Sequence, residues 1–287
     1  MKKVLFCVLA YLSAASAGEF AKTGDEYVYR DTLRFDESAM DLKTLEIESL
    51  NGFIRLTGED RSSVYVEACV EIKADNLEDG EEFLKEFRPI VKRSGENLRV
   101  YGEYPESKLS WNDISANIDF IISAPRSIDL TASCANGEIE AAEMTGSADL
   151  ECANGEITFL SATGVSGFLN ASCANGQVTV DIGTLNGNSE FNTANGEINV
   201  SVHRSLAGNI SASTANGVIT LALPENSDMK VVANSVINGS VYSEWSGDHQ
   251  KKMIGDEFEL VVNGGKYLVE CSSVNGQIAI RKANRAN

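Results

Sequence analysis

The stretch Ala135-Asn136-Gly137-Glu138-Ile139 decides the fold, because the sequence returns to it at nearly regular intervals. From Asn136 to Asn238 the repeat asparagines are separated by 18, 21, 20, 21 and 22 residues. A period that stays near twenty despite small insertions predicts a stacked repeat, in which each unit buries its apolar face against its neighbours. The Asn-Gly pairs expected to turn the chain are Asn136 and Gly137, Asn154 and Gly155, Asn175 and Gly176, Asn195 and Gly196, Asn216 and Gly217, Asn238 and Gly239, and Asn275 and Gly276, with a looser copy at Asn51 and Gly52.

Apolar and polar residues alternate on both sides of each Asn-Gly pair. This alternation predicts two strands per unit, each with one apolar face turned inward. A second turn is expected about ten residues after the first, near Gly146 and Gly164, which fits a two-sided coil. We therefore predict an all-β fold, a parallel β-solenoid with about twenty residues and two main strands per coil. In the first unit the inward positions are Leu130, Ala132, Cys134, Ile139 and Ala141.

An antiparallel sandwich of hairpins is the alternative, because Asn-Gly is also the strongest two-residue hairpin signal. One observation argues against the sandwich: the same residue types recur at the same distance from each asparagine. Residues of the same type lie next to one another only if successive coils are parallel and in register. Because side chains alternate along a strand, the asparagine side chains should point inward. In such a stack they would form a ladder of amide hydrogen bonds. The glycines would supply a positive φ at the corner.

The segments outside the repeat are expected to cap the stack. Strands are predicted over residues 26–35, 45–50, 53–56, 63–72, 98–101 and 118–122, with a polar loop carrying Trp111 over 107–117. A helix is predicted from Leu77 to Lys92, but Pro89 should end or kink it. Residues 18–128 would then form N-terminal strands, a first coil and a helix cap. Residues 129–287 would hold the repeats, with a lid inserted around 242–266.

The first seventeen residues are typical of a secretory signal peptide. Lys2 and Lys3 precede nine apolar residues, which are too few to span a bilayer, and small residues ending at Ala17 follow. We expect an exported protein, in the periplasm or on the cell surface, with no transmembrane segment after cleavage. Without this segment the chain keeps 22 basic and 42 acidic residues, a net charge of −20. Such a charge disfavours nucleic acid as a partner.

Five cysteines remain after cleavage, and three of them lie two residues before a repeat asparagine. A position that accepts Cys, Thr, Val and Ser indicates a small buried packing site. Parallel stacked side chains are also poorly oriented for a disulfide, so we expect free thiols. The residues at this position are Cys134, Cys152, Cys173, Thr193, Thr214, Val236 and Ser273.

The order of the motifs suggests a family. A first Leu-Asn-Gly coil at residues 50–52 is followed by a Val-Tyr-Val-Glu strand, a short helix and an Asp-Phe-Ile-Ile-Ser-Ala-Pro-Arg segment at 119–126. Serial Asn-Gly-Glu-Ile coils and a closing Ser-Val-Asn-Gly-Gln-Ile-Ala-Ile come next. The chain resembles, over roughly 45–281, bacterial exported β-strand-repeat proteins that carry a domain of unknown function and are often called putative adhesins. The resemblance implies a β-solenoid at the cell envelope, and it supplies no catalytic or ligand residues.

The sequence offers few candidates for chemistry, and we assign no catalytic, cofactor-binding or metal-binding residue. His203 and His249 lie in dissimilar surroundings, and the spacings typical of zinc and calcium motifs are absent. A row two residues after the asparagines carries Glu138, Glu156, Gln177 and Glu197. Stacked carboxylates form either a solvated acidic face, which we favour, or a weak calcium site.

We predict a non-catalytic protein that is adhesin-like or structural. Its partner would be an unknown envelope protein or a glycan. The alternative is a polysaccharide-acting β-helix enzyme, which would need paired carboxylates and aromatic platforms for sugar rings. The outward positions hold mostly Ser, Thr, Asn, Glu and Gln, with hardly an aromatic residue among them.

Overall fold

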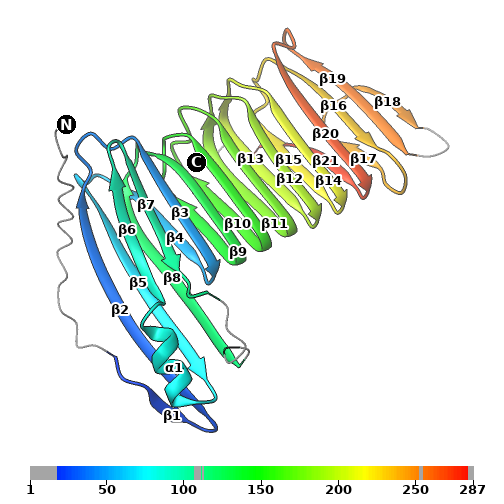
Figure 1. Cartoon of the computed structure of the whole chain (residues 1–287). Coiled ribbons are helices and arrows are strands. Elements are labelled where there is room, and N and C mark those ends of the chain that lie inside the picture. Colours follow the sequence, from blue (N-terminus) through cyan, green and yellow to red (C-terminus); the bar gives the residue numbers. More distant parts are fainter. Residues whose placement is uncertain (1–17, 107–110, 112, 252–254, 284–287) are drawn as a thin grey trace, which may run out of the picture.

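The computed structural model describes residues 18–106, 111, 113–251 and 255–283. The signal peptide expected over residues 1–17 lies outside this range. The described chain is all-β with one helix, α1 (Leu77–Leu84) (Figure 1). Both parallel and antiparallel strand pairs are present, so the predicted all-β class and the predicted parallel strands are confirmed.

The N-terminal strands surround α1 and begin the stack. Strands β2, β5 and β8 form a long antiparallel group, and β4 connects β8 to β9, the first repeat strand. The hairpin β6–β7 connects to β9 through β3. The repeat units therefore extend two strand layers, and α1 lies against β5 below the hairpin β6–β7 (Figure 1). The elements are β1 (Ala21–Thr23), β2 (Glu26–Ser38), β3 (Thr44–Asn51), β4 (Ile54–Glu59), β5 (Ser63–Ala74), β6 (Arg88–Ser94), β7 (Asn97–Glu103) and β8 (Ile114–Pro125).

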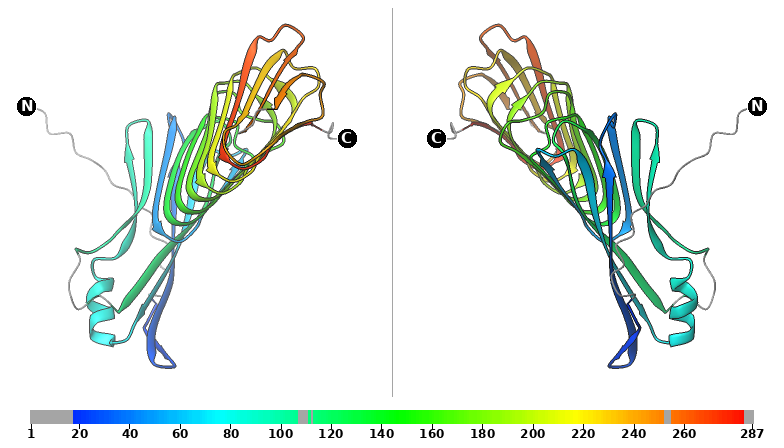
Figure 2. Two further views of the ribbon diagram at one scale, coloured as in Figure 1. Left: turned by 90° about the vertical axis from the view of Figure 1, so that its right-hand side faces the viewer. Right: turned by 90° about the vertical axis from the view of Figure 1, so that its left-hand side faces the viewer.

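The repeat strands pair in parallel and in register. Asn154 lies between Asn136 and Asn175, and Ile157 lies between Ile139 and Val178. Figure 2 looks along the stack and shows successive units lying behind one another, while α1 and the long N-terminal strands extend beyond them. The strands are β9 (Asp129–Ala142), β10 (Ala148–Ser161), β11 (Leu169–Leu185), β12 (Ser189–Asn195), β13 (Ile198–Leu206), β14 (Ile210–Asn216) and β15 (Ile219–Leu223).

The C-terminal end does not follow the order of the chain. Strand β20 pairs on one side with β14 and on the other with β16, so the last repeat lies between two units that precede it in sequence. An antiparallel pair, β18–β19, then continues the sheet beyond β16. The strands are β16 (Met229–Ser235), β17 (Val241–Ser243), β18 (Asp248–Lys251), β19 (Asp256–Val262), β20 (Tyr267–Asn275) and β21 (Ile278–Lys282).

The core lies between the two layers and consists of rows of like residues. Each row member contacts its counterpart in the next unit, and burying one such aliphatic side chain contributes about 1.5–3 kcal/mol. The row that follows the Asn-Gly pairs is fully buried and comprises Ile54, Ile139, Ile157, Val178, Ile198, Ile219 and Ile278.

The helix is shorter than predicted. Asn76 caps it by accepting the backbone N–H of Glu78 at 2.9 Å, and Phe83 packs into the core. The helix ends at Leu84, and Pro89 lies in β6, which pairs with β7 alone among the described strands. Proline is tolerated there because an edge strand need not donate every N–H to a ladder. The second half of the predicted helix is therefore wrong.

Two further predictions need correction. The polar loop was expected to reach residue 117, but β8 already begins at Ile114, because it pairs with the long strand β5. Trp111, predicted to lie on this polar loop, is buried, and its ring packs edge-on against Phe83, with ring centroids 5.4 Å apart.

Candidate binding surface

The repeat asparagines form a single column along one corner of the stack. Each Nδ2 donates to the Oδ1 of the neighbouring asparagine at 2.9–3.3 Å, from Asn136 onto Asn51 through to Asn238 onto Asn275. The side chains are exposed, which corrects the expectation that they point inward. The strict alternation of a strand is interrupted at this corner: the inward faces resume at the third residue after the asparagine rather than the second.

The glycine after each asparagine makes this bend possible. Gly137, Gly155 and Gly176 have φ values of 150°, 146° and 146°, a region that residues with a side chain rarely adopt. A Cβ at Gly155 would also overlap the carbonyl oxygen of Gly137 in the adjacent unit. Strands β9, β10 and β11 run through their Asn-Gly pairs, whereas β12 ends at Asn195 and β13 begins at Ile198.

A buried hydroxyl or thiol supports each bend from inside. The residue two before the asparagine donates to the glycine carbonyl of the adjacent unit at 3.1–3.5 Å, which explains why Cys, Thr and Ser interchange there. Val236 was expected at this position, but Ser235 pairs with Ser273 and makes the bond, because one extra residue precedes Asn238. Val236 is instead half exposed.

The cysteines are free thiols, as predicted for the mature chain. Burial, with the neighbouring Cys152, raises the pKa of Cys173 to about 11. The hydrogen bond with Cys134 and burial raise the pKa of Cys152 in the same direction. Thiols with raised pKa values remain protonated at neutral pH, so they act as weak donors and packing groups rather than nucleophiles.

A groove runs along the outside of this corner. It has a volume of about 770 Å³ and crosses β3, β9, β10, β11 and β12. Its lining includes the residue before the asparagine in five successive units, which forms the floor of the groove. The row three residues before each asparagine flanks this floor and includes Glu48, Ser133, Glu151, Ser172 and Asn192. The floor row is Leu50, Ala135, Ala153, Ala174 and Ala194.

Two tyrosines line the groove where it meets the N-terminal hairpin β6–β7. Tyr104 packs against Phe87, with ring centroids 4.9 Å apart, and burial raises its pKa although it hydrogen-bonds the backbone of Asn51. Tyr101 lies opposite Glu48 on the neighbouring strand β3. Sequence reasoning missed both residues, because their place beside the repeat depends on the pairing of β7 with β3. The alternating pattern of 98–101 was the one available signal.

The acidic row two residues after the asparagines lies outside this groove. Glu156 stands in register between Glu138 and Gln177, so two like charges are adjacent. Gln177 interrupts the row and donates to Thr179 at 2.9 Å. Within the described ranges, no group of three or more His, Cys, Asp or Glu residues could hold a metal ion. Glu138, Glu156 and Glu197 are exposed on the surface.

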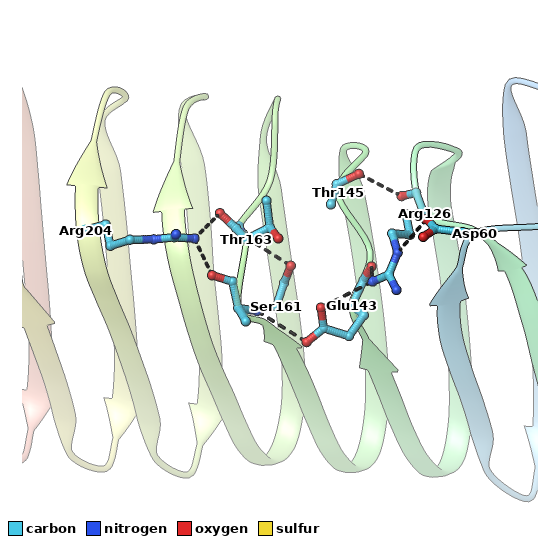
Figure 3. Close-up of polar contacts among 9 residues, drawn as sticks. Asp60, Arg126, Glu143, Thr145, Ser161, Thr163 and Arg204 are labelled. Carbon is cyan, nitrogen blue, oxygen red and sulfur yellow. Dashed lines mark hydrogen bonds and ion pairs between the residues drawn. The ribbon is translucent and has the colours of Figure 1, made fainter. Parts of the chain in front are cut away.

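The opposite corner of the stack includes several polar contacts that occur in single units (Figure 3). Arg126 bridges Asp60 and Glu143 at 3.2 and 3.4 Å. Glu143 has a φ of 57°, and its Oε1 accepts the backbone N–H of Ala162 at 3.4 Å. Arg204 donates to the carbonyl oxygens of Ala162 and the following threonine. These contacts hold loops of different lengths.

Neither of the two histidines lines the groove. His203 contacts Asp181 at 2.7 Å, and His249 contacts the buried Asp256 at 2.8 Å. Asp256 also accepts the backbone N–H of Val241 at 2.9 Å, which ties β19 to β17 near the C-terminal end of the stack. In the part of the chain that the structure describes, no helix is both long and apolar enough to span a membrane.

Comparison with known proteins finds weak similarity to solved structures. A putative cell adhesion protein from Clostridium sporogenes is 10% identical, with 88% of this chain and 99% of that chain covered and a TM-score of 0.33. For a putative adhesin from Bacteroides fragilis the identity is 11%, the coverage 87% and 97%, and the TM-score 0.33. For a putative lipid binding protein from Parabacteroides distasonis these values are 12%, 89% and 97%, and 0.32. No protein-family model and no curated protein matches the chain.

Proposed function

We propose that this chain is an exported, non-catalytic protein of the bacterial cell envelope, an adhesin-like β-solenoid that binds its partner along one corner. In this proposal residues 1–17 are a cleaved signal peptide and 18–128 cap a stack of coils of about twenty residues. Residues 129–287 form the rest of the stack, and the segment around 242–266 is a lid. The observation that carries the proposal is the groove beside the asparagine column, which joins a regular floor to two tyrosines.

The groove suits binding better than catalysis. Glu48, one of its two carboxylates, contacts Arg99 at 2.6 Å. This ion pair engages Glu48 with a side chain of the protein itself. The other, Glu151, is exposed, and the remaining lining consists of small, aromatic and amide side chains and the buried thiols. Such a lining supplies contact area and hydrogen bonds rather than a reactive pair.

Binding of the full-length mature chain to isolated envelope polysaccharides, peptidoglycan and envelope proteins tests this proposal. Ala153→Gln, which fills the groove without adding charge, should abolish binding. Ala215→Gln is the matched control, because Ala215 also precedes a repeat asparagine but does not line the groove. Equal loss in both variants, or binding to nothing in the panel, would contradict the proposed site. Shortened polysaccharide products would instead establish the enzyme alternative.

Export is tested separately by sequencing the N-terminus of the protein recovered from the periplasm and from the medium. The proposal predicts that the chain starts at Gly18, directly after the expected cleavage site. An uncleaved chain that stays in the cytoplasm would contradict it.

A further inference from the structure

We infer that the groove binds a linear, uncharged glycan, laid across the strands along the alanine row with one sugar ring beside Tyr101 and Tyr104. This inference rests on the proposed function and names the chemistry of its ligand. Three properties of the groove carry it: its straight floor, its polar edge and the charge around it.

The floor is straight because the repeat units are in register. Leu50, Ala135, Ala153, Ala174 and Ala194 are separated by four strand spacings of about 4.8 Å, which gives a length of about 19 Å. A floor of methyl groups leaves a channel wide enough for one chain and matches the C–H faces of sugar rings. Tyr101 and Tyr104 add aromatic surface at one end. An extended ligand of a few rings fits this shape, whereas a compact molecule would leave most of the floor uncovered.

One edge carries groups that both donate and accept hydrogen bonds. Ser133, Ser172 and Asn192 line this edge. A hydroxyl group and an amide group can each donate and accept. Sugar hydroxyls also donate and accept, and they can satisfy this edge along its length.

An extended peptide fits the same surface poorly. Recognition of an extended peptide usually adds a strand to a free sheet edge, which satisfies its backbone groups. Strands β9, β10 and β11 already pair on both sides, so no edge is free beneath the groove. A peptide lying across these strands would leave most of its backbone groups without a partner from the sheet, and an unmade hydrogen bond at a buried group costs about 1–3 kcal/mol.

The charge of the protein excludes anionic ligands. The mature chain is expected to carry a net charge of −20, and Glu48 and Glu151 line the groove itself. Like charges repel acidic polysaccharides, lipid headgroups and nucleic acids from such a surface. An uncharged glycan avoids this repulsion.

Calorimetric titration of the full-length mature chain with cellotetraose, chitotetraose and mannotetraose tests the inference, with tetragalacturonate as the anionic comparison. At least one neutral tetrasaccharide should bind, and Ala153→Gln and Ala174→Gln should each weaken it at least tenfold. Ala215→Gln should leave the affinity unchanged, and Tyr101→Ala should weaken it severalfold. Circular dichroism of each variant confirms that it is folded.

The inference is overturned if none of the three neutral probes binds, if tetragalacturonate binds as tightly, or if Ala215→Gln weakens binding as much as Ala153→Gln. An envelope protein that binds wild type but not Ala153→Gln would also overturn it, while leaving the proposed function intact. Loss of both kinds of binding in the wild-type chain would overturn the two together.

Discussion

The two corners of the stack are built in different ways. At the asparagine corner most units share three features: an amide bond along the column, a glycine with positive φ, and a buried donor to the glycine carbonyl of the adjacent unit. At the opposite corner Arg126, Glu143 and Arg204 each make contacts that no other unit copies (Figure 3). A repeated contact fixes the register of all units at once, whereas an individual contact fixes one loop.

This difference predicts how each corner responds to substitution. Changes at the asparagine corner disturb backbone geometry and buried groups, so they should be costly and should depend on position within the column. Changes at the opposite corner remove partly exposed ion pairs, which typically contribute about 0–1 kcal/mol. Four substitutions, from the largest expected effect to the smallest, test the contrast.

Replacing Gly155 should have the largest effect. In Gly155→Ala the new Cβ would meet both an unfavourable φ of 146° and the carbonyl oxygen of Gly137. We expect a loss of more than about 4 kcal/mol or failure to fold, measured by urea unfolding. Gly95→Ala is the control: its φ is 61°, but a Cβ there would have no atom within 4 Å, so it should cost only about 1–2 kcal/mol. Equal losses would contradict the close packing of adjacent units.

Removing the donor beneath the bend should come next. Cys152→Val leaves the Gly137 carbonyl without its 3.5 Å contact, and we expect a loss of about 1–3 kcal/mol in the free energy of unfolding. Cys152→Thr should be close to neutral, because Thr193 makes the same bond at 3.3 Å in another unit. If valine proved as stable as threonine, the position would be a packing site alone.

The column itself should show a difference between its middle and its end. Asn154→Ala removes two amide bonds, each 3.0 Å long, and should cost about 1–2 kcal/mol. Asn238→Ala, at the C-terminal end of the column, removes one longer bond of 3.3 Å and should cost about half as much. Thermal unfolding of both variants measures the ratio, and a larger loss at Asn238 would argue against a continuous ladder.

Arg204→Ala, at the opposite corner, should have the smallest effect. It removes hydrogen bonds to two loop carbonyl groups on the surface, and we expect a loss of at most about 1 kcal/mol. Arg126→Ala should behave alike, since its carboxylate partners are exposed. A loss as large as that of Cys152→Val would show that the two corners do not differ.

The same contrast explains what could be predicted from sequence. The asparagine spacing predicted parallel strands because each repeat strand pairs with the equivalent strand of the next repeat. The local sequence pattern therefore determines which distant residues pair. The direction of the asparagine side chains was mispredicted. The prediction assumed that side chains alternate between inward and outward along the whole strand, but this alternation is interrupted at a glycine with positive φ. Tyr104 and Arg204 were missed, because their partners lie far away in sequence and follow no period.

Distances between spin labels along the alanine row test the stack most directly. With the native cysteines replaced, labels at Ala135 and Ala215, at Ala135 and Val274, and at Leu50 and Val274 span four, five and six strand spacings. Electron paramagnetic resonance should give distances that grow evenly, from about 19 Å by about 4.8 Å per step. Distances that do not increase in this order would contradict the in-register stack and the groove that depends on it.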